Sequence, residues 1–318
     1  MKQFVITKQN EGQRFDKYLF RILDKGSMSF IFKMLRKKNF VLNDKKATGK
    51  EILKSGDIIK LYISDDTFEK FKTNAEVLDA SINDNKKLFV LQEKIVYEDK
   101  DIILINKPKN VLSQKAKKDD VSLNEYIIDY LVSSKWLALD DLKNFKPSCV
   151  NRLDRNTTGI IICAKTLKAA QYLSDSLKNR SVKKYYKCIV KGTFNKEGTY
   201  KGYLTKDNNN KVHISEQKTN ENSNYIETEY KLLRVEDGLS TVEVHLITGK
   251  SHQIRAHIAY LGFPIVGDNK YGDLECNRKY KVKNQMLHAY KIEFPIYDAK
   301  LEFAFSGKTY ICEPEFNL

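Results

Sequence analysis

The first hydrophobic positions of the chain recur at the spacing of two short helices. In residues 15–23 an apolar side chain returns every three or four positions, and the pattern breaks at Gly26. Ser27 or Ser29 can cap a second helix, because a serine hydroxyl accepts a hydrogen bond from a backbone amide of the first turn. The apolar face of that second helix comprises Ile31, Met34 and Leu35.

Strand-like segments follow the two helices. Residues 40–42 are apolar and precede a polar turn, and residues 58–63 form a second apolar run after a turn that contains glycine. Two helices and a small sheet predict an α/β module over residues 1–64. Residues 65–92 are weakly patterned, so we expect a linker there with one short helix. A larger domain is then expected over residues 93–318.

The rest of the chain is rich in short apolar runs. Runs at 95–97 and 102–105 are separated by four charged residues and predict a hairpin. Helices are expected over 122–136 and 166–178, and the polar segment 205–222 predicts an exposed loop. Further strands are predicted at 160–164, 185–190, 225–233, 240–247 and 286–294. Since strands predominate without a regular strand–helix alternation, we expect an α+β fold with a mostly antiparallel mixed sheet flanked by helices and loops.

Positive charge is concentrated at the start of the chain. The whole sequence has 56 Lys and Arg against 41 Asp and Glu, a net charge of +15. Residues 1–64 hold 15 of these bases and 6 of the acids, which is +9. Lys33, Arg36 and Lys37 share the polar face of the second helix. A basic face predicts a polyanionic partner such as RNA, because each neutralised phosphate releases counterions. The alternative is a lysine-rich surface that serves solubility.

Composition excludes several classes of protein. A hydrophobic content of 41% argues against a disordered chain. No run of 18 apolar residues exists, and the first residues lack the apolar core of a signal peptide. The five cysteines include no C-x-x-C pair, which argues against a disulfide framework or a cysteine zinc site. We therefore expect a cytoplasmic protein without a membrane segment.

Arginine is scarce, with 9 residues against 47 lysines, so each arginine suggests a need for the planar guanidinium. Arg152 and Arg155 flank Asp154 in N-R-L-D-R-N-T-T-G, a polar turn between two apolar runs. An aspartate between two cations is expected to stay ionised, which suits a catalytic carboxylate. The alternative is a solvated turn that is stabilised by its own side chains.

A second dense segment is L-I-T-G-K-S-H-Q-I-R-A-H, which ends at His257. A turn at Thr248-Gly249 precedes Ser251, which is expected to cap a helix that starts near His252. Arg255 lies off the apolar face of that helix. The two histidines are not four residues apart and have no nearby acid, so packing or RNA contact is expected rather than metal binding.

These segments resemble the signatures of pseudouridine synthases of the ribosomal large-subunit type. The first resembles H-R-L-D-x-x-T-S-G, and the second resembles L-x-T-G-R-x-H-Q-I-R-x-H. The segments I-V-Y-E-D-K-D-I-I-L-I-N-K-P, K-K-Y-Y and F-P-I-V-G-D-N-K-Y-G agree in order with the same family, so the resemblance covers about residues 94–296. Asn151, Thr158 and Lys250 depart from the usual residues, and none of these changes touches the aspartate.

The resemblance implies an RNA isomerase that needs no cofactor and no metal. By position, Asp154 is the catalytic carboxylate, acting either as a nucleophile or as a base on the ribose 2′ position, and Arg255 pairs with it. Tyr186 matches the tyrosine that stacks on the uracil, with Tyr185 as the competing register. Arg152 resembles the arginine that fills the gap left by the flipped nucleotide.

Residues 14–63 resemble the S-four-like RNA-binding module, so we expect Lys33, Arg36 and Lys37 to contact RNA. Arg152 and Arg155 are expected to contact RNA as well. The expected substrate is large-subunit ribosomal RNA. Transfer RNA is one alternative, and a non-catalytic RNA-binding role in ribosome assembly is another. The joint presence of an aspartate, a tyrosine and an arginine at the matching positions speaks against the second. We expect RNA as the partner, no obligate protein partner and a monomer.

Overall fold

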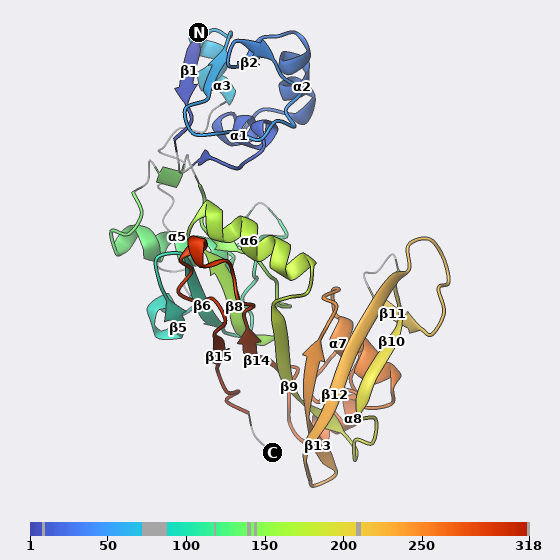
Figure 1. The fold of residues 1–318 in the computed structure, drawn as a ribbon. Helices are drawn as coiled ribbons and strands as arrows, with labels where there is room; N and C mark the ends of the chain where they lie inside the picture. Colours follow the sequence, from blue (N-terminus) through green and yellow to red (C-terminus); the bar gives the residue numbers. More distant parts are fainter. Residues whose placement is uncertain are drawn as a thin grey trace. The chain divides into compact units, whose positions relative to one another are not determined.

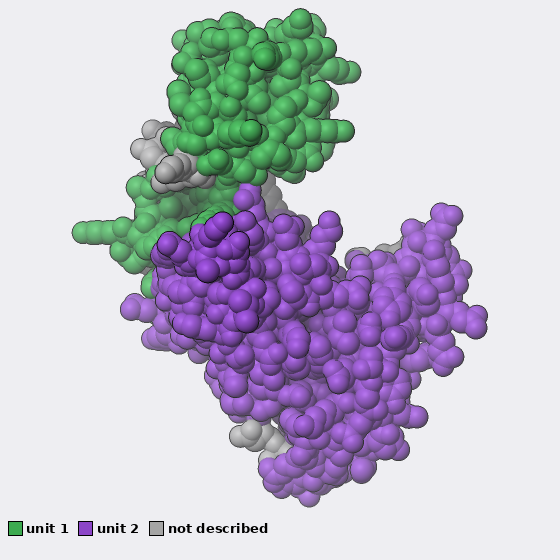
Figure 2. Space-filling model, in the orientation of Figure 1, with its two compact units in different colours: residues 1–90, 124–148, 165–168 green, residues 91–123, 149–164, 169–318 purple. Residues whose placement is uncertain are grey.

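The computed structural model describes all but short segments of the chain (Figure 1). The described residues are 1–7, 10–71, 88–117, 119–138, 141–142, 145–207 and 211–316. The chain divides into two compact units, which Figure 2 shows in different colours. The first unit comprises residues 1–90, 124–148 and 165–168, and the second comprises 91–123, 149–164 and 169–318.

The first unit begins with a small α/β module. Its elements are β1 (Lys2–Val5), α1 (Phe15–Ile22), α2 (Met28–Arg36), β2 (Phe40–Leu42), β3 (Lys45–Lys46), β4 (Ile58–Leu61) and α3 (Asp65–Phe71). The strands form an antiparallel sheet in the order β1-β4-β2-β3. Phe15 and Leu19 of α1 pack with Ile31 and Leu35 of α2 and with Phe40 of β2 in one buried core. The apolar faces seen in the sequence thus supply this core.

The helices and strands expected in this module are present, and two further elements join them. Ser27 caps α2, since its hydroxyl accepts a hydrogen bond from the backbone N–H of Phe30 at 3.2 Å. β1 was not predicted and pairs with β4. α3 lies in the segment predicted as a linker, and its Phe68 ring is buried in the module core. Residues 72–87 of that segment lie outside the described residues.

The second unit is built on a large twisted sheet. Its strands are β5 (Ile95–Glu98), β6 (Ile102–Lys107), β7 (Ser148–Cys149), β8 (Thr158–Ala164), β9 (Lys183–Lys191), β10 (Gly198–Lys206), β11 (Val212–Ser215), β12 (Asn224–Glu236), β13 (Leu239–Leu246), β14 (Leu287–Glu293) and β15 (Thr309–Ile311). The order is β11-β10-β12-β13-β9-β14-β8-β6-β5, with β7 beside β8 and β15 beside β14. In the sheet described here only β8 and β14 run parallel, which confirms the mostly antiparallel mixed sheet.

Helices occupy the connections between these strands. They are α5 (Leu123–Ser133), α6 (Leu167–Lys178), α7 (Gln253–Tyr260) and α8 (Leu274–Lys279), with short 3₁₀ helices at Leu91–Lys94 and Ala299–Leu301. α7 packs on the end of the sheet that holds β10 to β12, where Ala256 contacts a cluster that includes Val212 and Ile226. Figure 1 draws α7 beside β11, at this end of the sheet.

The prediction of an exposed loop over 205–222 is wrong for part of that segment. β11 lies within it and pairs with the end of β10 to form a hairpin. Its Val212 side chain is buried, and Ile214 packs against the same cluster. The alternation of apolar and polar residues in Val-His-Ile-Ser is only four residues long, and the polar residues on both sides outweighed it. Residues 208–210 lie outside the described part of the chain.

Gly159 fixes the start of β8, just after the loop that carries Asp154. Its φ is +109°, and a Cβ at this position would lie 2.3 Å from the carbonyl oxygen of Ala289 in β14. Both features require glycine, because an L side chain disfavours this backbone and would overlap the neighbouring strand. The close approach of β8 and β14 therefore sets where the Asp154 loop ends.

Candidate active site

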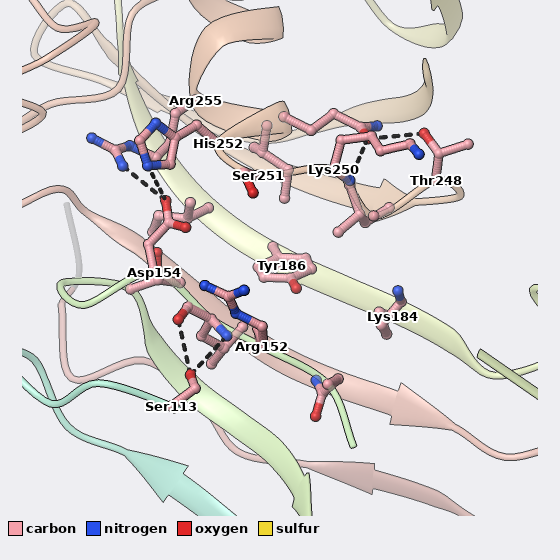
Figure 3. A pocket seen from close by; sticks show the side chains of 18 of the residues that line it. Ser113, Arg152, Asp154, Lys184, Tyr186, Thr248, Lys250, Ser251, His252 and Arg255 are labelled. Carbon is pink, nitrogen blue, oxygen red and sulfur yellow. Dashed lines mark hydrogen bonds and ion pairs between the residues drawn. The ribbon is translucent and has the colours of Figure 1, made fainter. Parts of the chain in front are cut away.

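A cleft of about 910 Å³ opens in the second unit, among the loop before β8, the middle of β9 and the first turn of α7. Figure 3 shows side chains from all three segments around it. Among the described residues, the lining holds seven lysines and arginines and one acidic residue. The basic residues are Arg152, Arg155, Lys178, Arg180, Lys184, Lys250 and Arg255, and the acid is Asp154. A concave surface of this charge suits a polyanionic ligand.

Arg255 links two carboxylates. Its Nη1 donates a hydrogen bond to Oδ2 of Asp154 at 2.8 Å. Its Nε and Nη2 donate to the two oxygens of Asp268 at 2.7 and 2.9 Å. The Asp268 side chain is fully buried and also accepts backbone hydrogen bonds from Lys270 and Tyr271. Asp268 therefore orients the guanidinium so that Nη1 faces Asp154.

The charges of this pair stabilise each other. Burial alone raises the pKa of Asp268, but the hydrogen bonds and the charge of Arg255 outweigh it and hold that pKa below its usual range. Burial likewise disfavours the charged form of Arg255, yet Asp268 and Asp154 raise the pKa of the guanidinium. Arg255 and Asp268 are therefore both charged at neutral pH.

His252 makes a second contact with Asp154. Its Nε2 lies 3.8 Å from Oδ2 of Asp154, and its Nδ1 lies 3.0 Å from the Tyr271 hydroxyl. That hydroxyl accepts a hydrogen bond from the backbone N–H of Val212 at 2.9 Å. We assign the hydroxyl proton to Nδ1, which places the proton of the neutral ring on Nε2, toward Asp154. Burial lowers the pKa of His252, which favours this neutral form.

The backbone on both sides of Asp154 is held by side chains from the preceding loop and strand. Ser113 Oγ donates to the carbonyl oxygen of Leu153 at 2.9 Å and accepts from its N–H at 3.0 Å. The buried Lys107 donates to the carbonyl oxygen of Arg155 at 3.0 Å and to two carbonyl oxygens in the loop after β6. These contacts restrict the position of the carboxylate, which is what a reacting group requires.

Of the two neighbouring tyrosines in K-K-Y-Y, Tyr186 is the one that lines the cleft. It is almost fully buried, at 5% exposure, on the cleft side of β9. Tyr185 points to the opposite face of the sheet, because successive residues of a strand alternate. There it stacks on His245 with ring centroids 4.5 Å apart. Burial, and secondly the charge of Asp154, raises the pKa of Tyr186, so its phenol stays protonated at neutral pH.

Comparison with known families decides what this cleft belongs to. A sequence model of the family described as RNA pseudouridylate synthase matches residues 101–260, which include Asp154, Tyr186 and Arg255. The chain belongs to this family. It is therefore an isomerase that acts on RNA, as the sequence predicted.

Relatives of the synthase match most of its length. The uncharacterized RNA pseudouridine synthase MG370 of Mycoplasma genitalium is 34% identical over 92% of this chain and 89% of its own. The ribosomal large subunit pseudouridine synthase C of Rickettsia felis is 32% identical over 95% of this chain and 97% of its own. The structure of human RNA pseudouridylate synthase domain containing 1 has a TM-score of 0.53 at 23% identity and covers 70% of this chain and 83% of that one. This likeness shows a shared fold.

The structure gathers five of the predicted site residues of the synthase in the cleft. Asp154, Tyr186 and Arg255 lie as described, and Arg152 and Arg155 are exposed residues of its lining. The other three predicted RNA contacts lie in the first unit. Lys33, Arg36 and Lys37 are exposed on and just after α2, on the side away from its buried residues.

Three residues that position Asp154 were not identified from the sequence. Asp268 and Tyr271 belong to the G-D-N-K-Y-G segment, which contributed to the family resemblance without a role for either residue. His252 was interpreted as a packing or RNA-binding residue. The expected cap on α7 is also wrong: Ser251 does not cap it. His252 occupies the cap position with a φ of +57°, and the backbone N–H of Lys250 donates to Gln253 Oε1 at 3.0 Å.

Two further features limit what the described part of the synthase can bind or span. No group of three or more His, Cys, Asp and Glu side chains in this part of the synthase is arranged to hold a metal ion. None of the helices described above is long and apolar enough to cross a membrane.

Proposed function

We propose that this synthase converts uridine to pseudouridine in large-subunit ribosomal RNA, with Asp154 as the catalytic carboxylate. The observation that carries the assignment is the setting of Asp154, the one acidic residue of a cleft lined by seven bases. Its Oδ2 contacts both Arg255 and His252. Its Oδ1 has no hydrogen-bond partner among the described residues, so one oxygen is available to the substrate.

The reaction moves the uracil within one nucleotide. The bond from N1 to the ribose C1′ breaks, the ring turns, and C5 bonds to C1′ while C5 loses a proton and N1 gains one. A carboxylate with one free oxygen suits attack at C1′ and also removal of the ribose 2′ proton. Tyr186 presents a protonated phenol and an aromatic ring beside it, which suits stacking on the uracil.

Reaching the glycosidic bond requires that the uridine leave its helix. A flipped base leaves a gap in the stack, and an exposed cation at the mouth of the cleft is suited to fill it. We assign this role to Arg152, which lies below Tyr186 in Figure 3. Arg155 is assigned a contact to the RNA backbone from the same loop.

The choice of ribosomal RNA rests on a relative and on the N-terminal module. The Rickettsia felis relative, similar over 97% of its length, is named as a ribosomal large subunit synthase. The α2 face with Lys33, Arg36 and Lys37 supplies an exposed row of bases in a separate small core, as in an S-four-like RNA-binding module. A row of this kind increases affinity for any phosphate backbone and does not read sequence.

The central experiment compares the wild-type synthase with Asp154→Ala on in vitro transcribed large-subunit ribosomal RNA. We expect pseudouridine with the wild type, none with the variant, and equal RNA affinity for both. Normal turnover by Asp154→Ala would overturn the catalytic assignment. Mapping pseudouridines in cells with and without the gene tests the substrate: sites lost only from transfer RNA would replace ribosomal RNA as the target.

The role of the N-terminal module is tested by salt dependence. Replacing Lys33, Arg36 and Lys37 by Gln is expected to reduce the slope of log affinity against log salt by about 2, since each single-strand phosphate contact contributes about 0.7. The control replaces Lys196, Lys201 and Lys231 by Gln, which are exposed and lie outside the cleft lining. Equal slopes for the two triple variants would contradict an anchoring role for α2.

A further inference from the structure

Lys184 is a basic residue of the cleft to which neither the sequence motifs nor the proposed chemistry assigns a role. It precedes Tyr186 by two residues on β9, so both side chains are on the same face of the sheet. It lines the cleft beyond Tyr186, on the side away from Asp154 (Figure 3). Its Nζ reaches the turn at Gly249, where it lies 3.3 Å from the place a Cβ would occupy.

The ammonium of Lys184 has no acidic partner among the residues that the structure describes. The other lysines along β9 that lie near acids are paired: Lys187 with Glu313 and Lys191 with Asp273. Lys184 makes no hydrogen bond or ion pair with any described residue. Its burial lowers its pKa, and no neighbouring carboxylate acts against that. A half-buried cation without a nearby counter-charge is unfavourable, so its presence on the cleft wall indicates an anion from outside the protein.

We propose that Lys184 binds a backbone phosphate of the RNA next to the flipped uridine. The inference rests on the proposed function, in which RNA occupies this cleft. A phosphate oxygen carries the negative charge that would balance this ammonium, whereas a uracil carbonyl is neutral. The position also fits. Lys184 lies on the same cleft wall as Asp154 and Tyr186, beyond Tyr186, so an RNA strand that fills the cleft passes within reach of its ammonium.

Neighbouring residues supply the rest of a phosphate site. Lys250 follows Gly249 on the turn that Lys184 contacts, and its side chain also lines the cleft. Lys178 and Arg180, at and just after the end of α6, line the cleft as well. Gly249 leaves open the space in which the Lys184 ammonium lies. These four bases come from three segments. Lys184 is the base that belongs to a strand of the sheet, and the backbone of β9 fixes its position.

The test uses the full-length synthase with in vitro transcribed large-subunit ribosomal RNA at several salt concentrations. Lys184→Met keeps the length of the side chain and removes the charge. We expect kcat/KM to fall about tenfold and the slope of its logarithm against log salt to become shallower by about 0.7 to 0.9. Lys184→Arg should restore most of the activity. The matched control is Lys183→Met, an exposed lysine on the opposite face of β9, which should leave both quantities unchanged.

Each other outcome has a distinct meaning. A reduced kcat with an unchanged salt slope would overturn the proposed phosphate contact and indicate a contact with the uracil. If Lys184→Met had the kcat/KM of the wild type, Lys184 would make no contact with the RNA that matters for catalysis, and the proposal would be overturned. A lower midpoint of thermal unfolding, with a parallel loss of activity, would indicate a structural role, because removal of an unpaired, half-buried charge should not destabilise the fold. If the wild type is inactive on this RNA, the substrate proposal fails, and the salt slope of RNA binding still tests Lys184 separately.

Discussion

The ion pair between Arg255 and Asp268 gives the sharpest prediction about this synthase. We consider Asp268→Asn, which changes one oxygen to nitrogen and keeps the size of the side chain. Oδ1 of Asp268 accepts from Arg255 Nη2 and from two backbone N–H groups, so the amide oxygen of the variant should take that place. The amide nitrogen then replaces Oδ2 and faces the Nε–H of Arg255, which donates to Oδ2 at 2.7 Å in the wild type. The amide N–H and the Nε–H are both donors, so this hydrogen bond would be lost.

The size of the effect follows from the burial of the pair. Asp268 has a side-chain exposure of 0% and Arg255 of 10%. Loss of one hydrogen bond to a charged group costs about 1.5–3 kcal/mol, and removal of one partner from a buried pair costs about 3–5 kcal/mol. Asp154 remains as a second counter-charge for Arg255, so we expect a loss near the low end, about 3 kcal/mol in the free energy of unfolding. For a domain of this size that corresponds to a thermal midpoint about 6–12 °C lower.

Activity and pH provide two independent readouts. Arg255 orients Asp154, so its displacement should lower kcat by about 10²-fold. The pKa of Asp268 is lowered in the folded protein, and the stability it contributes is present above its unfolded pKa and lost as pH falls through the folded value. The difference between wild type and variant should therefore be constant from pH 8 to about 5 and shrink below about pH 4.

The assay is urea unfolding at several pH values together with pseudouridine formation. The control is Asp273→Asn, a similar change at a partly exposed pair with Lys191, where the asparagine still caps α8. It should change the free energy of unfolding by less than about 1 kcal/mol and leave kcat unchanged. If Asp268→Asn behaved like this control, the argument that Asp268 positions Arg255 beside Asp154 would be refuted.

Two further changes test the frame around the site. Gly159→Ala should destabilise the synthase by about 2 kcal/mol more than Gly198→Ala, because both glycines have a φ of +109° but only Gly159 presses on Ala289; equal thermal midpoints would contradict this. Burial lowers the pKa of His257 to about 4, so the unfolded chain binds more protons below pH 6.5. Wild type should then lose about 2 kcal/mol more than His257→Gln between pH 6.5 and 5, and parallel pH profiles from denaturant unfolding would exclude the effect.

Local patterns were sufficient to predict most of the elements. The apolar spacing of residues 15–35 predicted α1 and α2, and the apolar runs predicted β5, β6, β8, β9 and β12 to β14. The short strands β1, β3, β7, β11 and β15 and the short helix α8 were missed, because two to six residues do not stand out from their surroundings. The nine-residue β10 was missed as well, because two glycines interrupt its few apolar residues. The packing of α3 was also missed, because its sequence has one large apolar residue that becomes buried, Phe68.

The register of β9 shows where pattern alone stops. Tyr185 and Tyr186 are chemically identical neighbours, and a shift of one residue exchanges the two faces of a strand. Nothing local distinguishes them, and the family motif alone favoured Tyr186. The pairing of β9 with β13 and β14 places Tyr186 toward the cleft and Tyr185 toward His245.

By itself the sequence determined the fold class and the family and proposed a set of site residues, because these depend on short motifs and on periodicity. Tertiary structure decided which groups act on Asp154. Arg255 is 101 residues away from it, and the contacts of Asp268, His252 and Tyr271 exist only because α7 packs against β10 to β12. It also showed Lys184 as a cation without a counter-charge. Such properties depend on distances between segments far apart in the chain, which no local pattern encodes.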